Sequence, residues 1–318
     1  MIKRIKDIYL EIYSSKYKTI WNELIKDSSN ALFFHNREYL EYNKSLYKER
    51  SLLIFRKKTL VAIFLANVTG DTVYSYSGLT FGGLLLKNGE RSSEIAKYLD
   101  LIINFYSKEG FKKIIYKPVP HIFHKYPCEE DLFFLMKYDT KILRRDLSSY
   151  IPLSPNKKNV KYSNLRKRQI KKAKLNNILI TENIPIEIFY SLLEKTLLKH
   201  NAKPTHKLND LFFLCEKFPE EIKFKAAKKD DRFLSAVMIF RFMNIFHTQY
   251  IVNSNKGKEF GALDLIIDDL LTNTEIKGLS LGRSNSPKNN LEINEGLIWQ
   301  KESFGARGII LETYEIKL

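Results

Sequence analysis

The stretch "HTQYIVNSNKGKEFGALDLIIDDLL", from His247 to Leu271, contains the clearest transition from strand to helix in the sequence. It begins with a strand-like segment and ends with an apolar stripe at helical spacing, formed by Leu263, Ile266, Ile267, Leu270 and Leu271. The first N–H groups of a helix have no internal acceptor, and the helix dipole adds positive potential. Small residues also let an anion approach the backbone. We therefore interpret the junction as a phosphate-binding loop made of Asn255, Lys256, Gly257, Lys258, Gly261 and Ala262, with a plain tight turn as the alternative.

The pattern around this stretch occurs twice. Strands are predicted at 222–228, 232–241 and 245–252, and earlier at 51–56, 59–67 and 72–77. Polar turns separate the strands within each triplet, at Lys57-Lys58, Gly70-Asp71, Asp230-Asp231 and Asn244. A short strand and two amphipathic helices precede each triplet, and a helix, a strand, a helix and an extended segment follow it. The sequence thus predicts two copies of one α/β unit, with mixed, mainly antiparallel sheets flanked by helices, in domains 1–153 and 154–318.

Composition limits the class of protein. The chain has 318 residues, of which 44% are hydrophobic, so two cores can be buried. Cys128 and Cys215 are the only cysteines, which excludes a disulfide framework and favours a reducing cytoplasm. No apolar run approaches the roughly 20 residues that span a bilayer, and we expect a soluble cytoplasmic protein. The net charge of +17 favours anionic partners such as cofactor phosphates, nucleotide-linked substrates, RNA or an acidic membrane face. The alternative is that the lysine-rich composition reflects an AT-rich genome.

The predicted order of elements resembles the GNAT acyltransferase fold. In that family, the strand–loop–helix after the antiparallel meander holds the pyrophosphate of acyl-coenzyme A through a Q/R-x-x-G-x-G/A motif. The segment "NKGKEFGA", Asn255 to Ala262, resembles this motif but lacks the initial Gln or Arg. Two such units in one chain resemble the Fem-type (FemAB-like) transferases, which build the peptide bridge of peptidoglycan from aminoacyl-tRNA.

Three further segments resemble members of this family. "NLRKRQIKKAKLNNILITE" is similar to the basic helix that precedes the second unit in Fem-type proteins. "NEGLIWQKESFGA" and "SYSGLTFGGLL" resemble a bacterial branch of GNAT- or Fem-like acyltransferases associated with surface-polysaccharide synthesis. Tyr76 and Phe81 stand where the pattern S-H-x-G-x-T-Y-G-G of that branch has His and Tyr. The long helical hairpin that many Fem-type proteins carry, usually linked to tRNA, has no counterpart in the pattern.

The resemblance implies an N-acyltransferase of the cell envelope. The expected donor is acyl-CoA, in particular acetyl-CoA, bound by the second domain. The expected acceptor is an amino sugar or nucleotide-sugar, bound on the side of the first domain. One alternative is Fem-type transfer from aminoacyl-tRNA to a peptidoglycan precursor. Another is a basic protein without enzymatic activity that binds RNA or a membrane surface.

His247 and Glu295 are the candidate catalytic residues. A histidine titrates near neutral pH, so His247 on the fourth strand of the second unit can take the amine proton. The alternative is a histidine that is hydrogen-bonded inside the fold. Glu295 begins a helix and is a second candidate base; a favourable charge at the helix N-terminus is its alternative.

The candidate substrate-binding residues lie on strand ends and loops. Gln249 should share a strand face with His247, and Tyr250 the other face. Arg283 and Ser284 end a strand, where α/β folds bind ligands, although Arg283 can also form a salt bridge. The remaining candidates lie on loops, for which plain solvation is the alternative: Lys203, His206, Tyr76 and Thr80. His121, His124 and Cys128 do not have the spacing of a common zinc module, and we predict no metal site.

Overall fold

The computed structural model describes residues 7–42, 44–154, 160–199, 201–272, 275–286, 289 and 291–318. The chain forms two compact units. Unit 1 comprises Met1–Arg145 together with Ile310–Leu318, and unit 2 comprises Asp146–Ile309. This division differs from the predicted boundary after residue 153, which left the last segment in the second domain. Ile310–Leu318 belongs to unit 1 because Tyr314 and Ile316 are buried in the core of that unit.

Unit 2 contains a mixed sheet built on the predicted meander. Strands β11 (Ile222–Lys229), β12 (Arg232–Phe242) and β13 (Ile245–Asn253) pair antiparallel, as the sequence predicts. The turns between them, Asp230-Asp231 and Met243-Asn244, place Asp230 and Met243 at positive φ. β10 (Leu179–Thr181) pairs with β11 at one edge. β14 (Gly278–Arg283) runs parallel to β13, and β9 (Thr140–Pro152) pairs antiparallel with β14.

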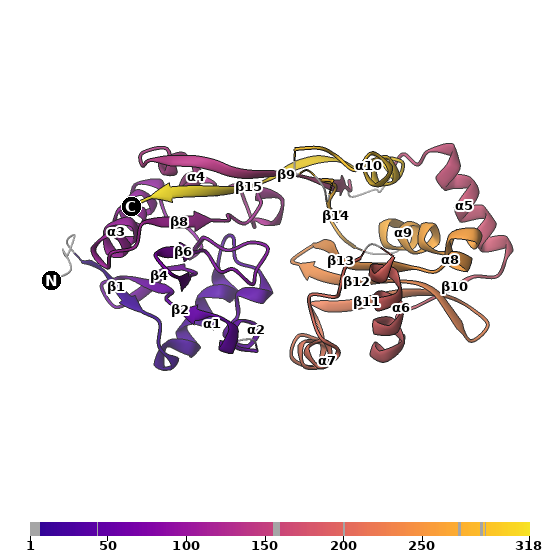
Figure 1. Ribbon diagram of the computed structural model, residues 1–318, viewed down its shortest axis with the longest axis horizontal. Helices are drawn as coiled ribbons and strands as arrows, with labels where there is room; N and C mark the ends of the chain where they lie inside the picture. The colour runs from indigo at the N-terminus through magenta and orange to yellow at the C-terminus, as the bar shows by residue number, and fades with distance from the viewer. Residues whose placement is uncertain are drawn as a thin grey trace. The chain divides into compact units, whose positions relative to one another are not determined.

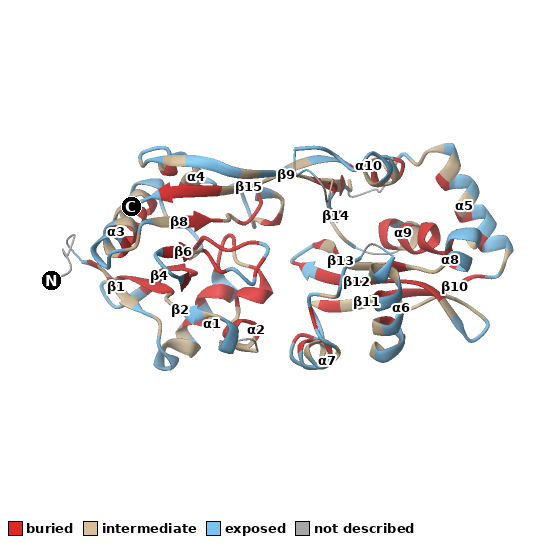
Figure 2. Cartoon of the chain, in the orientation of Figure 1, coloured by how far each residue is buried: buried red, intermediate tan, exposed pale blue. Residues whose placement is uncertain are grey.

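Helices cover both faces of this sheet. Figure 1 shows α9 (Ala262–Thr272), α8 (Asn255–Phe260) and α5 (Asn164–Leu175) on one side, and α6 (Ile186–Leu198) and α7 (Leu208–Lys217) on the other. α9 is buried along most of its length (Figure 2), because its apolar stripe packs against β12 and β14. Helix α10 (Glu295–Glu302) follows β14, and the side chain of Asn294 caps its first turn.

Unit 1 is built around two sheets. The first has the order β1-β3-β4-β7, with β1 (Ile8–Ile12), β3 (Leu52–Arg56), β4 (Thr59–Phe64) and β7 (Leu84–Leu86). The second includes β2 (Lys48–Glu49), β5 (Asn67–Thr69), β6 (Thr72–Tyr74) and β8 (Lys113–Tyr116), and β15 (Arg307–Lys317) pairs with β8. The helices are α1 (Lys18–Asp27), α2 (Arg37–Glu41), α3 (Ser92–Lys108) and α4 (Glu130–Leu135). Short 3-10 turns lie at Ser15–Tyr17, Phe33–His35, Lys44–Leu46 and His121–Phe123.

The two units share one succession of strands but exchange the last one. In unit 2, β13 is followed by parallel β14, and antiparallel β9 pairs with β14. In the sheet of unit 1, β8 pairs parallel with β6, and β15 pairs antiparallel with β8. The sequence pattern assigned each extended segment to the half that it ends. In the structure, β9 of the first half completes the sheet of unit 2, and β15 of the second half completes that of unit 1.

None of the helices that the structure describes is long and apolar enough to cross a bilayer.

Candidate functional site

Two neighbouring strands of unit 2 separate and leave a cavity between them. β13 and β14 pair only along Ile245–His247 and Gly278–Ser280, after which they diverge. β13 also carries a bulge at Gln249, because Met238 pairs with Tyr250 while the next residue of β12, Ile239, pairs with Thr248. Bulges redirect a strand and occur often beside active sites. A cavity of about 280 Å³ lies at the divergence, and all of its described lining residues belong to unit 2.

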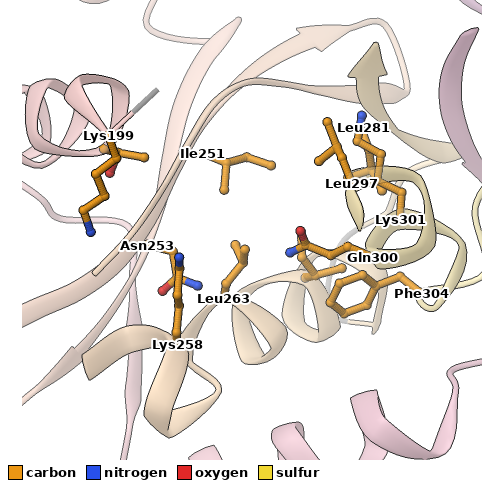
Figure 3. A pocket seen from close by; sticks show the side chains of 12 residues that line it. Lys199, Ile251, Asn253, Lys258, Leu263, Leu281, Leu297, Gln300, Lys301 and Phe304 are labelled. Atoms are coloured by element: carbon orange, nitrogen blue, oxygen red, sulfur yellow. The ribbon is translucent and has the colours of Figure 1, made fainter. Parts of the chain in front are cut away.

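The wall of the cavity combines apolar and polar side chains (Figure 3). The apolar side chains are those of Ile251, Leu263, Ile267, Leu281, Leu297 and Phe304. The polar side chains are those of Thr196, Lys199, Asn253, Lys258, Gln300 and Lys301. No carboxylate is found among the described lining residues, so the cavity suits an uncharged or anionic ligand better than a cationic one.

Lys301 is the most unusual residue of the wall. Its side chain comes from α10 and is buried, with 6% of the residue exposed. Its ammonium group donates to the backbone oxygens of Gly282 (2.8 Å) and Arg283 (2.7 Å), and to Oγ of Ser284 (2.9 Å). Burial lowers the pKa of Lys301 to about 8, although three acceptors surround the charge. The lysine therefore brings positive potential to the end of β14, where the cavity lies.

Neither predicted catalytic residue lines the cavity. His247 is half-buried on β13, its ring stacks on Phe242, and its Nδ1 lies 3.0 Å from Oγ of Ser280. Burial, together with the positive charges of Lys301 and Arg283, lowers the pKa of His247 to about 4. The imidazole is therefore neutral at pH 7. Glu295 is exposed in the first turn of α10, where its negative charge interacts favourably with the positive end of the helix dipole.

The predicted phosphate loop is largely helical. Asn255–Phe260 forms α8, and Oγ of Ser254 accepts a hydrogen bond from the N–H of Gly257 (2.9 Å). Gly257 is buried; a Cβ there would lie 2.5 Å from the backbone oxygen of Leu234. Oδ1 of Asn255 accepts a hydrogen bond from Lys199 (3.0 Å), while Lys256 is exposed. The segment is thus a short capped helix and not an open loop.

The start of α9 is the part of the predicted loop that borders the cavity. Gly261 has φ +71° and ends α8, and α9 begins at Ala262. The first hydrogen bond of α9 joins the N–H of Leu265 to the oxygen of Gly261 (3.1 Å). The three preceding N–H groups have no intrahelical acceptor, as at any helix start. Lys258 and Leu263, on either side of this turn, line the cavity.

The predicted substrate-binding residues of unit 2 fall into separate places. Ser284 contacts Lys301, and Arg283 forms an ion pair with Asp146 (3.2 Å). Nδ1 of His206 lies 2.7 Å from the hydroxyl of Tyr250, and the two rings meet edge to face. Burial lowers the pKa of His206. Gln249 forms the bulge of β13, and Lys203 is exposed on the loop between α6 and α7.

Tyr76 and Thr80 belong to unit 1. Tyr76 is buried and has φ +69°, a backbone conformation that residues other than glycine rarely adopt. Its hydroxyl donates to the backbone oxygen of Leu40 (3.5 Å). Thr80 is exposed on the same loop. Sγ of Cys128 lies 3.3 Å from Nδ1 of His124, but no three possible ligands among the described residues could hold a metal ion.

Lys301 and the cavity were missing from the predicted site. A signal for Lys301 is present in the sequence, since Leu297, Lys301 and Phe304 are spaced by four and three residues, the spacing of side chains on one helix face. A lysine on an apolar helix face is a buried charge. Asn253 and Gln300 carry no comparable signal, because their place on the wall depends on the divergence of two strands.

Comparison of the chain with known proteins gives a fold. No family model matches the sequence, and no curated protein matches it. In three dimensions the chain is similar to FemX, with a TM-score of 0.69 and 10% identity over 98% of this chain and 97% of that one. The chain has the fold of FemX. This finding confirms the predicted two-unit Fem-like α/β class.

Two other solved structures are also similar to the chain. A conserved protein of unknown function from Bacteroides thetaiotaomicron has a TM-score of 0.59 and 14% identity, over 98% of this chain and 99% of that one. L-PGS from Bacillus licheniformis has a TM-score of 0.54 and 10% identity, over 80% of this chain and 81% of that one. At such identities these likenesses, like that to FemX, concern the fold alone.

Proposed function

We propose that the protein is an acyltransferase that moves an acyl group from an activated donor to an amine. The observation that carries the proposal is the cavity at the divergence of β13 and β14, with a buried lysine in its wall. An acyl group enters between the strands, and its carbonyl comes to rest near Lys301. The amine attacks the carbonyl, a C–N bond forms, and the bond to the donor oxygen or sulfur breaks.

Lys301 supplies the electrostatic part of this reaction. The tetrahedral intermediate carries a negative oxygen, and fixed positive charge in a site shielded from water stabilises it. The three acceptors of its ammonium group hold the lysine in place before the substrate arrives. His247, through Ser280 on β14, holds the strand end that carries those acceptors, and we assign it a positioning role. The proton of the amine leaves with the departing oxygen or sulfur.

The first candidate donor is an aminoacyl-tRNA, as in the Fem-type transferases that the sequence resembles. Beyond the shared fold, the support is the basic surface of α5. Lys167, Arg168, Lys171 and Lys172 are exposed there, and no ion pair joins them to any described residue. Such a cluster attracts the phosphates of a nucleic acid. The acceptor is then the amine of a peptidoglycan precursor.

The second candidate donor is acyl-CoA. The turn from Gly261 into α9, with Lys258 beside the cavity, favours it, because a pyrophosphate can bind at this helix start. The acceptor is then an amino sugar or nucleotide-sugar for a surface glycan. A basic protein without enzymatic activity, which binds RNA or a membrane surface, is the outcome if neither donor is consumed.

The test supplies the full chain with charged tRNA or with acetyl-CoA, each with UDP-linked muramyl peptides and UDP-amino sugars. Mass spectrometry then detects acylated acceptors. We expect transfer from at least one donor, and a loss of about 100-fold in kcat/KM for Lys301→Met. Lys217→Met, which removes an exposed lysine of α7, is the matched control and should keep its activity. Absence of transfer from both donors would contradict the proposal.

A further inference from the structure

The cavity is larger and more apolar than an acetyl or glycyl group requires. Its volume is about 280 Å³. For comparison, an apolar cavity of about 150 Å³ in another protein holds a benzene molecule. A single methyl group would leave most of the apolar wall uncovered.

The apolar side chains are supplied by rigid elements. Leu281 comes from β14, Leu263 and Ile267 from α9, and Phe304 from the residues directly after α10. All four are buried, and Phe304 and Ile267 are almost inaccessible. Such a surface gains from every methylene that it covers, by about fourfold in affinity for each.

Of the three charged residues that the structure describes in the wall, two are exposed and the third is held by protein acceptors. Lys199 and Lys258 are exposed, and the ammonium group of Lys199 is hydrogen-bonded to Asn255. The ammonium group of Lys301 is occupied by three protein acceptors. With no carboxylate among the described lining residues, an ammonium group on the ligand's side chain would have no counter-ion.

We infer that the acyl group which this cavity takes is apolar and of the size of a leucyl, phenylalanyl or medium-chain acyl group. The inference rests on the proposed function and names the class of group transferred. It differs from the acetyl group that the sequence resemblance implies. Both possible donors can carry such a group, as leucyl-tRNA or as octanoyl-CoA.

The experiment compares donors that differ only in the acyl group. With the full chain, kcat/KM is measured for glycyl-, leucyl-, phenylalanyl- and lysyl-tRNA, and for acetyl- and octanoyl-CoA. Calorimetry with acetyl-CoA and octanoyl-CoA, and with glycyl and leucyl amides of 3′-amino-3′-deoxyadenosine, gives binding without turnover. We expect the apolar group to be favoured over glycyl or acetyl at least tenfold, and lysyl to be the poorest aminoacyl group.

Leu281→Trp fills the cavity and should lower the preference for the large group at least tenfold, while the smallest donor is still used or bound. Leu279→Ala is the matched control on the same strand, since Leu279 is buried but does not line the cavity. It should leave the preference unchanged even if it lowers stability.

The outcomes separate the two proposals. Binding that follows apolar size without any transfer supports the inference and contradicts the proposed function. Transfer that favours glycyl, acetyl or lysyl groups, or a preference that Leu281→Trp does not change, overturns the inference and leaves the proposed function standing. No binding and no transfer overturns both.

Discussion

At the scale of single residues, the site depends on groups whose charge is altered by burial. Lys301 and His247 lie close enough for the lysine to lower the pKa of the histidine. Their roles follow from partners that no local pattern reveals. Ser280, which His247 contacts, and Gly282, which Lys301 contacts, both lie on β14, and the parallel pairing of β13 with β14 brings Ser280 to His247. The sequence could therefore nominate His247 but not its partner.

The first prediction concerns the pH dependence of activity. The pKa of Lys301 is about 8, so its positive charge is lost as the pH rises through that value. If the ammonium group stabilises the intermediate, kcat/KM should fall with an apparent pKa near 8, and Lys301→Arg should move this limb to higher pH. A rate that rises through pH 8 would instead assign the neutral amine as a base.

The stability of the folded protein should depend on pH in the opposite sense to activity, because Lys301 destabilises the fold most when it is charged. Its pKa lies below the value of about 10.4 in an unfolded chain, so the unfolded state binds more protons between these values. The cost of burying the charge is therefore greatest below pH 8 and is relieved as the pH rises. The free energy of unfolding of the wild type should gain on that of Lys301→Met between pH 7 and pH 10, in urea titrations at each pH.

The second prediction concerns acid. The pKa of His247 is lowered to about 4, against about 6.5 when unfolded, so the unfolded chain takes up the proton first as the pH falls. The stability that depends on neutral His247 is complete above pH 6.5 and is lost toward pH 4. His247→Gln should therefore lose less stability than the wild type between pH 7 and pH 4.5, by on the order of 2 kcal/mol. Parallel losses in both proteins would refute this assignment.

At the scale of elements, hairpins were predictable and the short helix α8 was not. Lys57-Lys58 and Asp230-Asp231 connect strands as their polarity indicates, with Lys57 and Asp230 at positive φ. Gly257 within Asn255–Phe260 favours a loop, but the cap by Ser254 and the close packing of Gly257 against β12 stabilise a helical turn. Tertiary contacts thus decide against the local propensity.

The third prediction tests the turn between α8 and α9. Gly261 and Gly282 both have φ +71°, but a Cβ at Gly261 would lie 2.5 Å from the backbone oxygen of Gln169, whereas at Gly282 the nearest atom is 4.0 Å away. Gly282→Ala should cost about 1–2 kcal/mol from backbone strain alone. Gly261→Ala should cost at least 1 kcal/mol more, because α5 must move. Equal values by chemical denaturation would show that α5 does not pack here.

The fourth prediction concerns how α5 is held on α9. Nη1 of Arg166 lies 2.7 Å from Oδ1 of Asp264, and both side chains are about nine-tenths buried. Arg166→Met leaves the carboxylate buried without its counter-ion and should cost about 3–5 kcal/mol. Replacement of both residues, by Met and Leu, should recover most of this loss. A double variant as unstable as the single one would mean that packing, and not charge, is what Arg166 provides.

At the scale of the whole molecule, the repeat was predictable but the exchange of final strands was not. Alternating patterns identify β9 and β15 as strands equally well, and the sheet that each joins is a question of distant pairing. Burial decides it, since Tyr314 and Ile316 lie in the core of unit 1. Site residues that depend on such pairing, Leu281 and Gln300 among them, lie beyond what periodicity can indicate.

The fifth prediction follows from this exchange. Deletion of Ile310–Leu318 removes Tyr314 and Ile316 from unit 1 and leaves β8 without its neighbour. Hydrogen exchange followed by mass spectrometry should then show lost protection in peptides of unit 1, while β11 and β12 of unit 2 remain protected. Ile310→Ser, at an exposed position of the same strand, is the control. Lost protection in unit 2 would contradict the assignment.

The exchange of β9 and β15 between the units also affects the order in which the units can be completed during synthesis. Asp146–Ile309 is synthesised before Ile310–Leu318, so unit 1 lacks its final strand for as long as unit 2 is being made. During that interval β8 offers an open edge to any other nascent strand. A chain cut off before Ile310 would therefore hold every residue of unit 2 and lack the last segment of unit 1.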